Sequence, residues 1–145
     1  MSGALQLGGD TKAVLLADAG MFLLALLLGV WKYRQIATSE SHAAHVYVDI
    51  AHRVALLYSF ALLLVATFVA LSGWSATVNL VAAGAMTLYF YASVAGYALH
   101  GWREDTENQF HKPMPGLHLY MATLIVAEIG GWVVLAGGFL DKQIL

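Results

Sequence analysis

The chain has 145 residues, of which 60% are hydrophobic and only 11% are charged, and its formal net charge is −2. A soluble domain of this length has too little interior to bury that much apolar surface. The net charge is too small to suggest nucleic acid as a partner, and the sequence has no basic run. No cysteine is present, which excludes disulfides, iron–sulfur clusters and thiolate-ligated haem. A lipid bilayer is therefore the expected solvent.

Four segments are long and apolar enough to cross a bilayer, which takes about 20 residues per helix. In chain order they cover residues 13–33, 47–73, 76–100 and 117–140. The first segment is long for the apolar part of a signal peptide, so we expect it to be retained. The sequence predicts an all-α membrane protein, with residues 1–145 forming one domain as an up-down bundle of four transmembrane helices.

The connections between these segments differ in length. The second and third segments are joined by a short turn, "SGWSAT", whereas the other two connections are long and polar. More lysine and arginine residues lie in or beside the long connections (Lys32, Arg34, Arg103 and Lys112) than near the termini (Lys12 and Lys142). Positive residues favour the cytoplasmic side. We therefore expect a multi-pass protein of the bacterial cytoplasmic membrane with its long connections inside.

Polar side chains interrupt the start of the second segment. His45, Asp49 and His52 are spaced i, i+4, i+7 and share one helical face, which Ser59 continues inward. Arg53 is placed to pair with Asp49 or to bind an anion near the membrane interface. In an alternative interpretation, His45, Asp49 and His52 would together bind a metal ion without other ligands.

A second polar stripe runs along the third segment. Its members share one helical face: Tyr89, Ser93, Gly96, Tyr97 and His100. Adjacent helices run antiparallel, so His52 is expected at the depth of Tyr97 and His100. We expect the two stripes to meet in one polar cluster near the long connections. Gly96 would leave room there for a flat or bulky ligand.

Each of the three singled-out residues also has a structural interpretation. His52 is either a hydrogen-bonded interfacial histidine or a ligand of a metal or haem. Tyr97 taken alone is typical of an aromatic residue at the membrane interface. Glu128 lies near the middle of the fourth segment, where it is either bonded to a neighbouring helix or part of a site.

These features together resemble the styrene oxide isomerases and the related hydroxylaminobenzene mutases. The similarity lies in four short spans, a histidine within "AH" at the start of the second span, and a tyrosine late in the third. The separation of His52 from Tyr97 suits that family, as do "SVAGYAL", "NQF" at 108–110, and "AGMFLLALLLGV" in the first span. The chain departs from the family pattern at Tyr58 and Ser59, which replace an asparagine and a glycine.

The resemblance implies a homotrimer with haem b between its subunits. His52 would be the single axial ligand, and the ferric iron would act as a Lewis acid on a substrate oxygen. A small apolar aryl epoxide from the lipid phase would open to an aldehyde by a 1,2-hydride shift. Tyr97 and Tyr58 would orient the reacting oxygen. The other expected cofactor contacts are Arg53, Ser59, Ser93, Gly96, His100 and Arg103, with the two arginines on the haem propionates.

Three alternatives stay open. Within the same family, the chain would be a mutase of hydroxylamino-arenes, in which an N–O bond replaces the epoxide. In a second class it would be a membrane cytochrome b-like carrier of haem or electrons, with His100 as the second axial ligand opposite His52. In a third class it would be an accessory subunit of a larger membrane complex, without a cofactor.

Overall fold

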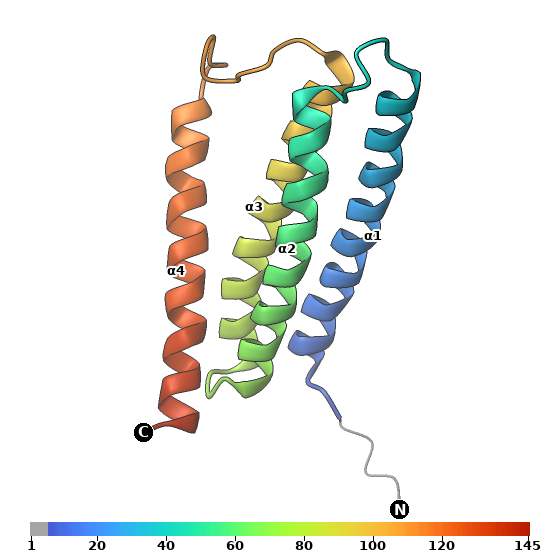
Figure 1. The fold of residues 1–145 in the computed structure, drawn as a ribbon. Coiled ribbons are helices and arrows are strands. Elements are labelled where there is room, and N and C mark those ends of the chain that lie inside the picture. The colour runs from blue at the N-terminus through green and yellow to red at the C-terminus, as the bar shows by residue number, and fades with distance from the viewer. Residues whose placement is uncertain (1–5) are drawn as a thin grey trace, which may run out of the picture.

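The computed structural model describes residues 6–145, and this part of the chain contains four α-helices and no strand. They are α1 (Gly9–Thr38), α2 (Val46–Leu71), α3 (Ala76–Arg103) and α4 (Leu117–Gln143). All four are long and apolar enough to cross a membrane. Consecutive helices run antiparallel (Figure 1). The predicted all-α bundle of four membrane-length helices is therefore confirmed.

The helix ends follow from local side-chain chemistry. His45 caps α2, since its Nδ1 accepts a hydrogen bond from the amide of Tyr47 at 3.2 Å. Ser75 caps α3 in the same way through the amide of Val78. Gly116, which precedes α4, has a φ of 88°, a left-handed conformation that glycine adopts without strain. Helices α2, α3 and α4 are therefore each preceded by a residue suited to ending the connection before the helix.

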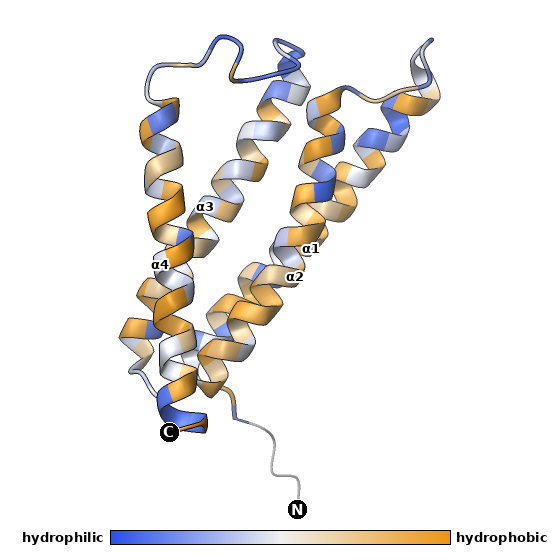
Figure 2. Cartoon of the chain, turned by 60° about the vertical axis from the view of Figure 1, so that its left-hand side comes forward, coloured by the Kyte–Doolittle hydropathy of each residue, from blue (hydrophilic) through white to orange (hydrophobic). Residues whose placement is uncertain are grey.

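Helix α2 is the central element of the bundle. It packs against α1, α3 and α4, whereas α1 and α4 make no contact with each other within the described residues (Figure 1). Val48, Leu62 and Val65 of α2 are almost completely buried. Apolar residues also cover much of the outer faces of the helices (Figure 2). Lipid chains are the natural solvent for such faces.

Helix α4 is anchored mainly through its C-terminal half. Gly131 lies against α3, where a Cβ would come within 2.8 Å of the Ala82 carbonyl oxygen. Gly138 lies against the turn between α2 and α3, and its carbonyl accepts from the Gly73 amide at 2.9 Å. The indole of Trp74 donates to the carbonyl of Val134 at 2.8 Å. These contacts leave space between the N-terminal half of α4 and the rest of the bundle.

The two long connections, 39–45 and 104–116, lie at the same end of the bundle (Figure 1). Gly101 allows α3 to approach α2 closely there, since a Cβ on it would lie 2.9 Å from the Val48 amide nitrogen. The Tyr47 hydroxyl accepts a hydrogen bond from the amide of Gln109 at 2.7 Å. The 104–116 connection is thereby held across the end of α2 and α3.

Candidate functional site

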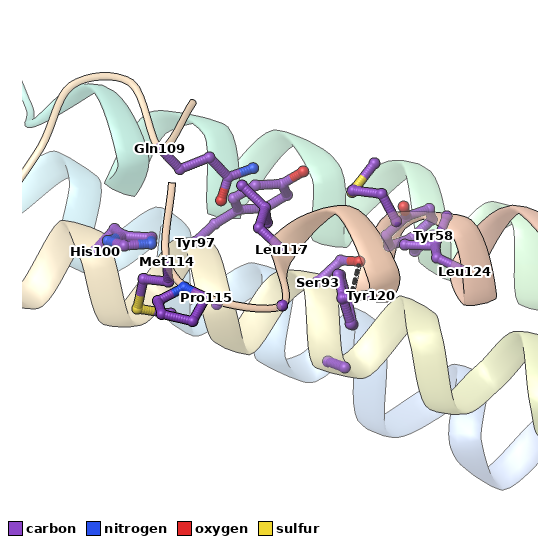
Figure 3. A pocket seen from close by; sticks show the side chains of 14 residues that line it. Tyr58, Ser93, Tyr97, His100, Gln109, Met114, Pro115, Leu117, Tyr120 and Leu124 are labelled. Atoms are coloured by element: carbon purple, nitrogen blue, oxygen red, sulfur yellow. Dashed lines mark hydrogen bonds between the residues drawn. The ribbon is translucent and has the colours of Figure 1, made fainter. Parts of the chain in front are cut away.

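A cavity of about 440 Å³ lies between α2, α3 and the N-terminal half of α4, under the 104–116 connection (Figure 3). This volume lies within the usual range for a small-ligand site. Its wall combines aromatic hydroxyls with apolar side chains. The polar residues that line it are Tyr58, Ser93, Tyr97, His100, Gln109 and Tyr120, and its small lining residues are Ala92, Gly96 and Gly116.

The hydroxyl groups of the cavity come from three different helices. Tyr58 of α2 stacks on the ring of Phe90, with 4.1 Å between the ring centroids. Ser93 of α3 and Tyr120 of α4 share a hydrogen bond of 3.0 Å between their oxygens (Figure 3). Tyr97 is stacked at 6.0 Å on Tyr47. Packing against neighbouring rings thus fixes the orientation of the phenols.

The loop-side end of the cavity is formed by His100. Its ring lies 5.2 Å from that of Tyr47, and its Nδ1 is 2.8 Å from a carboxylate oxygen of Asp105. Hydrogen bonding from this imidazole holds the pKa of the Asp105 carboxyl below its usual value. The pair ties the start of the 104–116 connection to the last turns of α3.

His52 lies on the opposite side of α2, facing α1. Its Nδ1 is 2.9 Å from the carbonyl oxygen of Ala25. Its ring packs against Gly29, where a Cβ would come within 2.8 Å of the imidazole Cε1. The prediction that the His52 stripe meets the Tyr97 stripe in one cluster is therefore wrong, because the His52 face of α2 is covered by α1.

Asp49 holds two cations beside His52. Lys32 of α1 lies 2.6 Å from one carboxylate oxygen and Arg53 lies 2.9 Å from the other. The expected pairing of Asp49 with Arg53 is present. The carboxylate does not hold the His52 ring, which bonds to the α1 carbonyl instead. One positive charge remains uncompensated in this group.

The remaining predicted site residues lie apart from the cavity. Ser59 is buried, and its hydroxyl donates to the carbonyl of Leu56 at 2.7 Å within α2. Arg53 and Arg103 are exposed near the loop-side end of the bundle. Among the described residues, no three histidine or acidic side chains gather as a metal site. The set of His45, Asp49 and His52 is accordingly not a chelating cluster.

Several residues of this region were not expected from the sequence. The roles of the Ala25 carbonyl and of Gly29 beside His52 could not be predicted, because alanine and glycine are common in any apolar helix. Tyr120 and Gln109 belong to a helix and a connection whose facing partners the sequence does not specify. Tyr120 was detectable in principle, because a tyrosine in the first turns of an apolar span faces either the interface or a neighbouring helix.

Comparison with known protein families, with characterised proteins and with solved structures finds no match to the chain.

Proposed function

We propose that the chain is a haem b-dependent membrane isomerase that acts on small apolar aromatic substrates, either aryl epoxides or, as the alternative, hydroxylamino-arenes. The observation that supports this most is the hydrogen bond between His52 and Ala25. A carbonyl oxygen only accepts, so Nδ1 of His52 carries the proton. In the neutral ring Nε2 then keeps its lone pair, as a metal ligand requires. A backbone carbonyl on the other ring nitrogen is a common support for such ligands.

The surroundings of His52 fit a haem group. A haem needs a single axial side chain, so a cluster of ligands is not required. Lys32 and Arg53, which share Asp49, add the positive charge that suits propionate groups. Gly29 and Ala25 keep side-chain bulk away from the imidazole on the α1 side. Lys32 was not among the expected propionate partners. Arg103, which was expected as one, lies at the end of α3 and is not part of the group around Asp49.

A ferric haem with one open axial position would supply Lewis acidity toward a substrate oxygen. The residues of the chain would perform the remaining tasks. Tyr97 and Tyr58 would donate hydrogen bonds that orient the substrate oxygen, and the cavity around them would exclude water. The Ser93–Tyr120 hydrogen bond would hold the α4 wall of this cavity in place. An apolar substrate would enter from the lipid and an apolar product would return to it.

A second copy of the chain is part of this proposal. Within one chain α2 separates His52 from the tyrosine-lined cavity, so a single copy does not place the substrate beside the ligand. In the homotrimer implied by the family resemblance, the part of His52 that α1 leaves exposed would face the neighbouring copy. The excess of lysine and arginine residues at the loop end also supports a place in the bacterial cytoplasmic membrane, with the long connections on the cytoplasmic side.

The geometry does not support a six-coordinate carrier in which both axial ligands come from one chain. In the carrier alternative, His100 would supply the second axial ligand opposite His52. The structure instead places His100 beside Tyr47 and Asp105, while His52 faces α1. The two imidazoles of one chain therefore do not face a common haem.

The experiment is an absorption spectrum of protein purified in detergent, with haem content measured as the pyridine haemochrome. Wild type and His111→Ala, which changes an exposed loop histidine, are expected to retain haem. His52→Ala is expected to remain in the membrane and to lose it. Haem-free wild type would instead indicate an accessory subunit. Membranes supplied in parallel with an aryl epoxide and a hydroxylamino-arene separate the two isomerase activities.

A further inference from the structure

Glu128 lies on α4 one helical turn beyond the residues that line the tyrosine-lined cavity. It falls on the same face of α4 as Met121 and Leu124, which line the cavity, one turn beyond the second of them. It is about 16 Å from the start of α4 at a rise of 1.5 Å per residue, well inside the membrane-length helix.

The Glu128 side chain is not satisfied by the bundle. Its Oε1 is buried and has no hydrogen-bond partner in the part of the chain that the structure describes. The only cation of α4 is Lys142, at the far end of the helix. An unpaired buried acceptor is costly, and an acidic residue inside a membrane span commonly marks a site. A ligand that donates a hydrogen bond at this position would remove the cost.

We propose that Glu128 makes this cavity selective for small aromatic molecules that carry an N–H or O–H donor. The ligand ring would lie among Tyr58, Tyr97 and the apolar side chains of α4, and its donor would point to the Glu128 carboxyl oxygen. The tyrosine hydroxyls, which both donate and accept, would bind other polar atoms of the ligand. Glu128 is thus a specificity-determining residue.

This inference rests on the proposed function only in taking the cavity as the substrate site. An aryl epoxide has an acceptor oxygen and no donor, whereas a hydroxylamino-arene has both N–H and O–H groups. Selection by Glu128 would therefore favour the second substrate class over the first. Ligand binding to the cavity is measurable without haem, so the two proposals fail independently.

The test compares 4-fluorophenol with 4-fluoroanisole, which has nearly the same shape but no donor. Binding is measured by ¹⁹F NMR in detergent, with empty micelles as the reference for partitioning. Wild type is expected to bind the phenol about tenfold more tightly than the anisole, as one hydrogen bond to a buried acceptor allows. Glu128→Met is expected to bind both ligands equally. Glu128→Gln keeps a side-chain carbonyl acceptor and is expected to keep the preference.

Gly96→Leu shows whether the ligand is in the cavity. Gly96 lines it, and a Cβ at this position has nothing within 4 Å, so the larger side chain fills the space. Both ligands should bind this variant at least tenfold more weakly than wild type. Equal affinities in wild type, a preference that survives Glu128→Met, unchanged binding to Gly96→Leu, or no binding at all would each overturn the inference.

Discussion

The packing of α4 on α3 allows a sharp prediction, because two adjacent glycines of α4 have different surroundings. A Cβ added at Gly131 would lie 2.8 Å from the Ala82 carbonyl oxygen and 2.7 Å from Cγ of Met86. A Cβ added at Gly130 would have nothing within 4 Å. The methionine can move, but the carbonyl belongs to the backbone of α3. Gly131→Ala must therefore push the two helices apart, whereas Gly130→Ala does not.

Overpacking of this kind costs about 1–3 kcal/mol. Both substitutions also replace glycine by alanine in a helix, so the change in helix propensity cancels between them. The difference between the two variants therefore isolates the helix contact. For a domain of this size, that free-energy difference corresponds to an unfolding midpoint of Gly131→Ala about 3–10 °C below that of Gly130→Ala. Thermal unfolding followed by circular dichroism in detergent measures this, and equal midpoints would refute the close contact of α4 with α3.

Two predictions concern the 104–116 connection. Tyr47→Phe removes the hydroxyl that accepts a hydrogen bond from the Gln109 amide. The loss of about 1 kcal/mol of stabilisation should speed hydrogen exchange at that amide about fivefold. An unchanged exchange rate would show that this hydrogen bond does not protect the amide. The lowered pKa of Asp105 makes its contact with His100 stabilising above the usual carboxyl value of 3.8 and progressively weaker as pH falls through the lower folded value. The protection factors of amides in the connection, which correct for the intrinsic pH dependence of exchange, should therefore fall from about pH 5 to about pH 3 in wild type. Asp105→Asn should lack this change, and the same fall in both proteins would contradict the prediction.

The sequence was sufficient for the fold because membrane-length apolar runs have few alternatives. The helix bounds differ mainly where polar residues continue a helix beyond its apolar run. Helix α1 extends to Gly9–Thr38 instead of 13–33, and α3 continues to Arg103. Helix α2 ends at Leu71, where Ser72 and Gly73 begin the short turn.

The site was predictable only in part, for a geometrical reason. Helical periodicity correctly places Ser93, Gly96, Tyr97 and His100 on one face, and the structure brings them to one cavity. Periodicity does not say which neighbour a face meets. The central helix α2 has several neighbours, so its His52 face meets α1 while Tyr58 meets the cavity.

The central claim of the proposed function is that His52 alone supplies an axial ligand to a haem. Ferric spin state and haem content of wild type and His52→Gly, purified with and without added imidazole, test it most directly. We predict five-coordinate high-spin haem in wild type, its loss from His52→Gly, and its recovery when imidazole occupies the vacated space. Full haem retention by His52→Gly without imidazole, or a six-coordinate low-spin wild type, would contradict the claim.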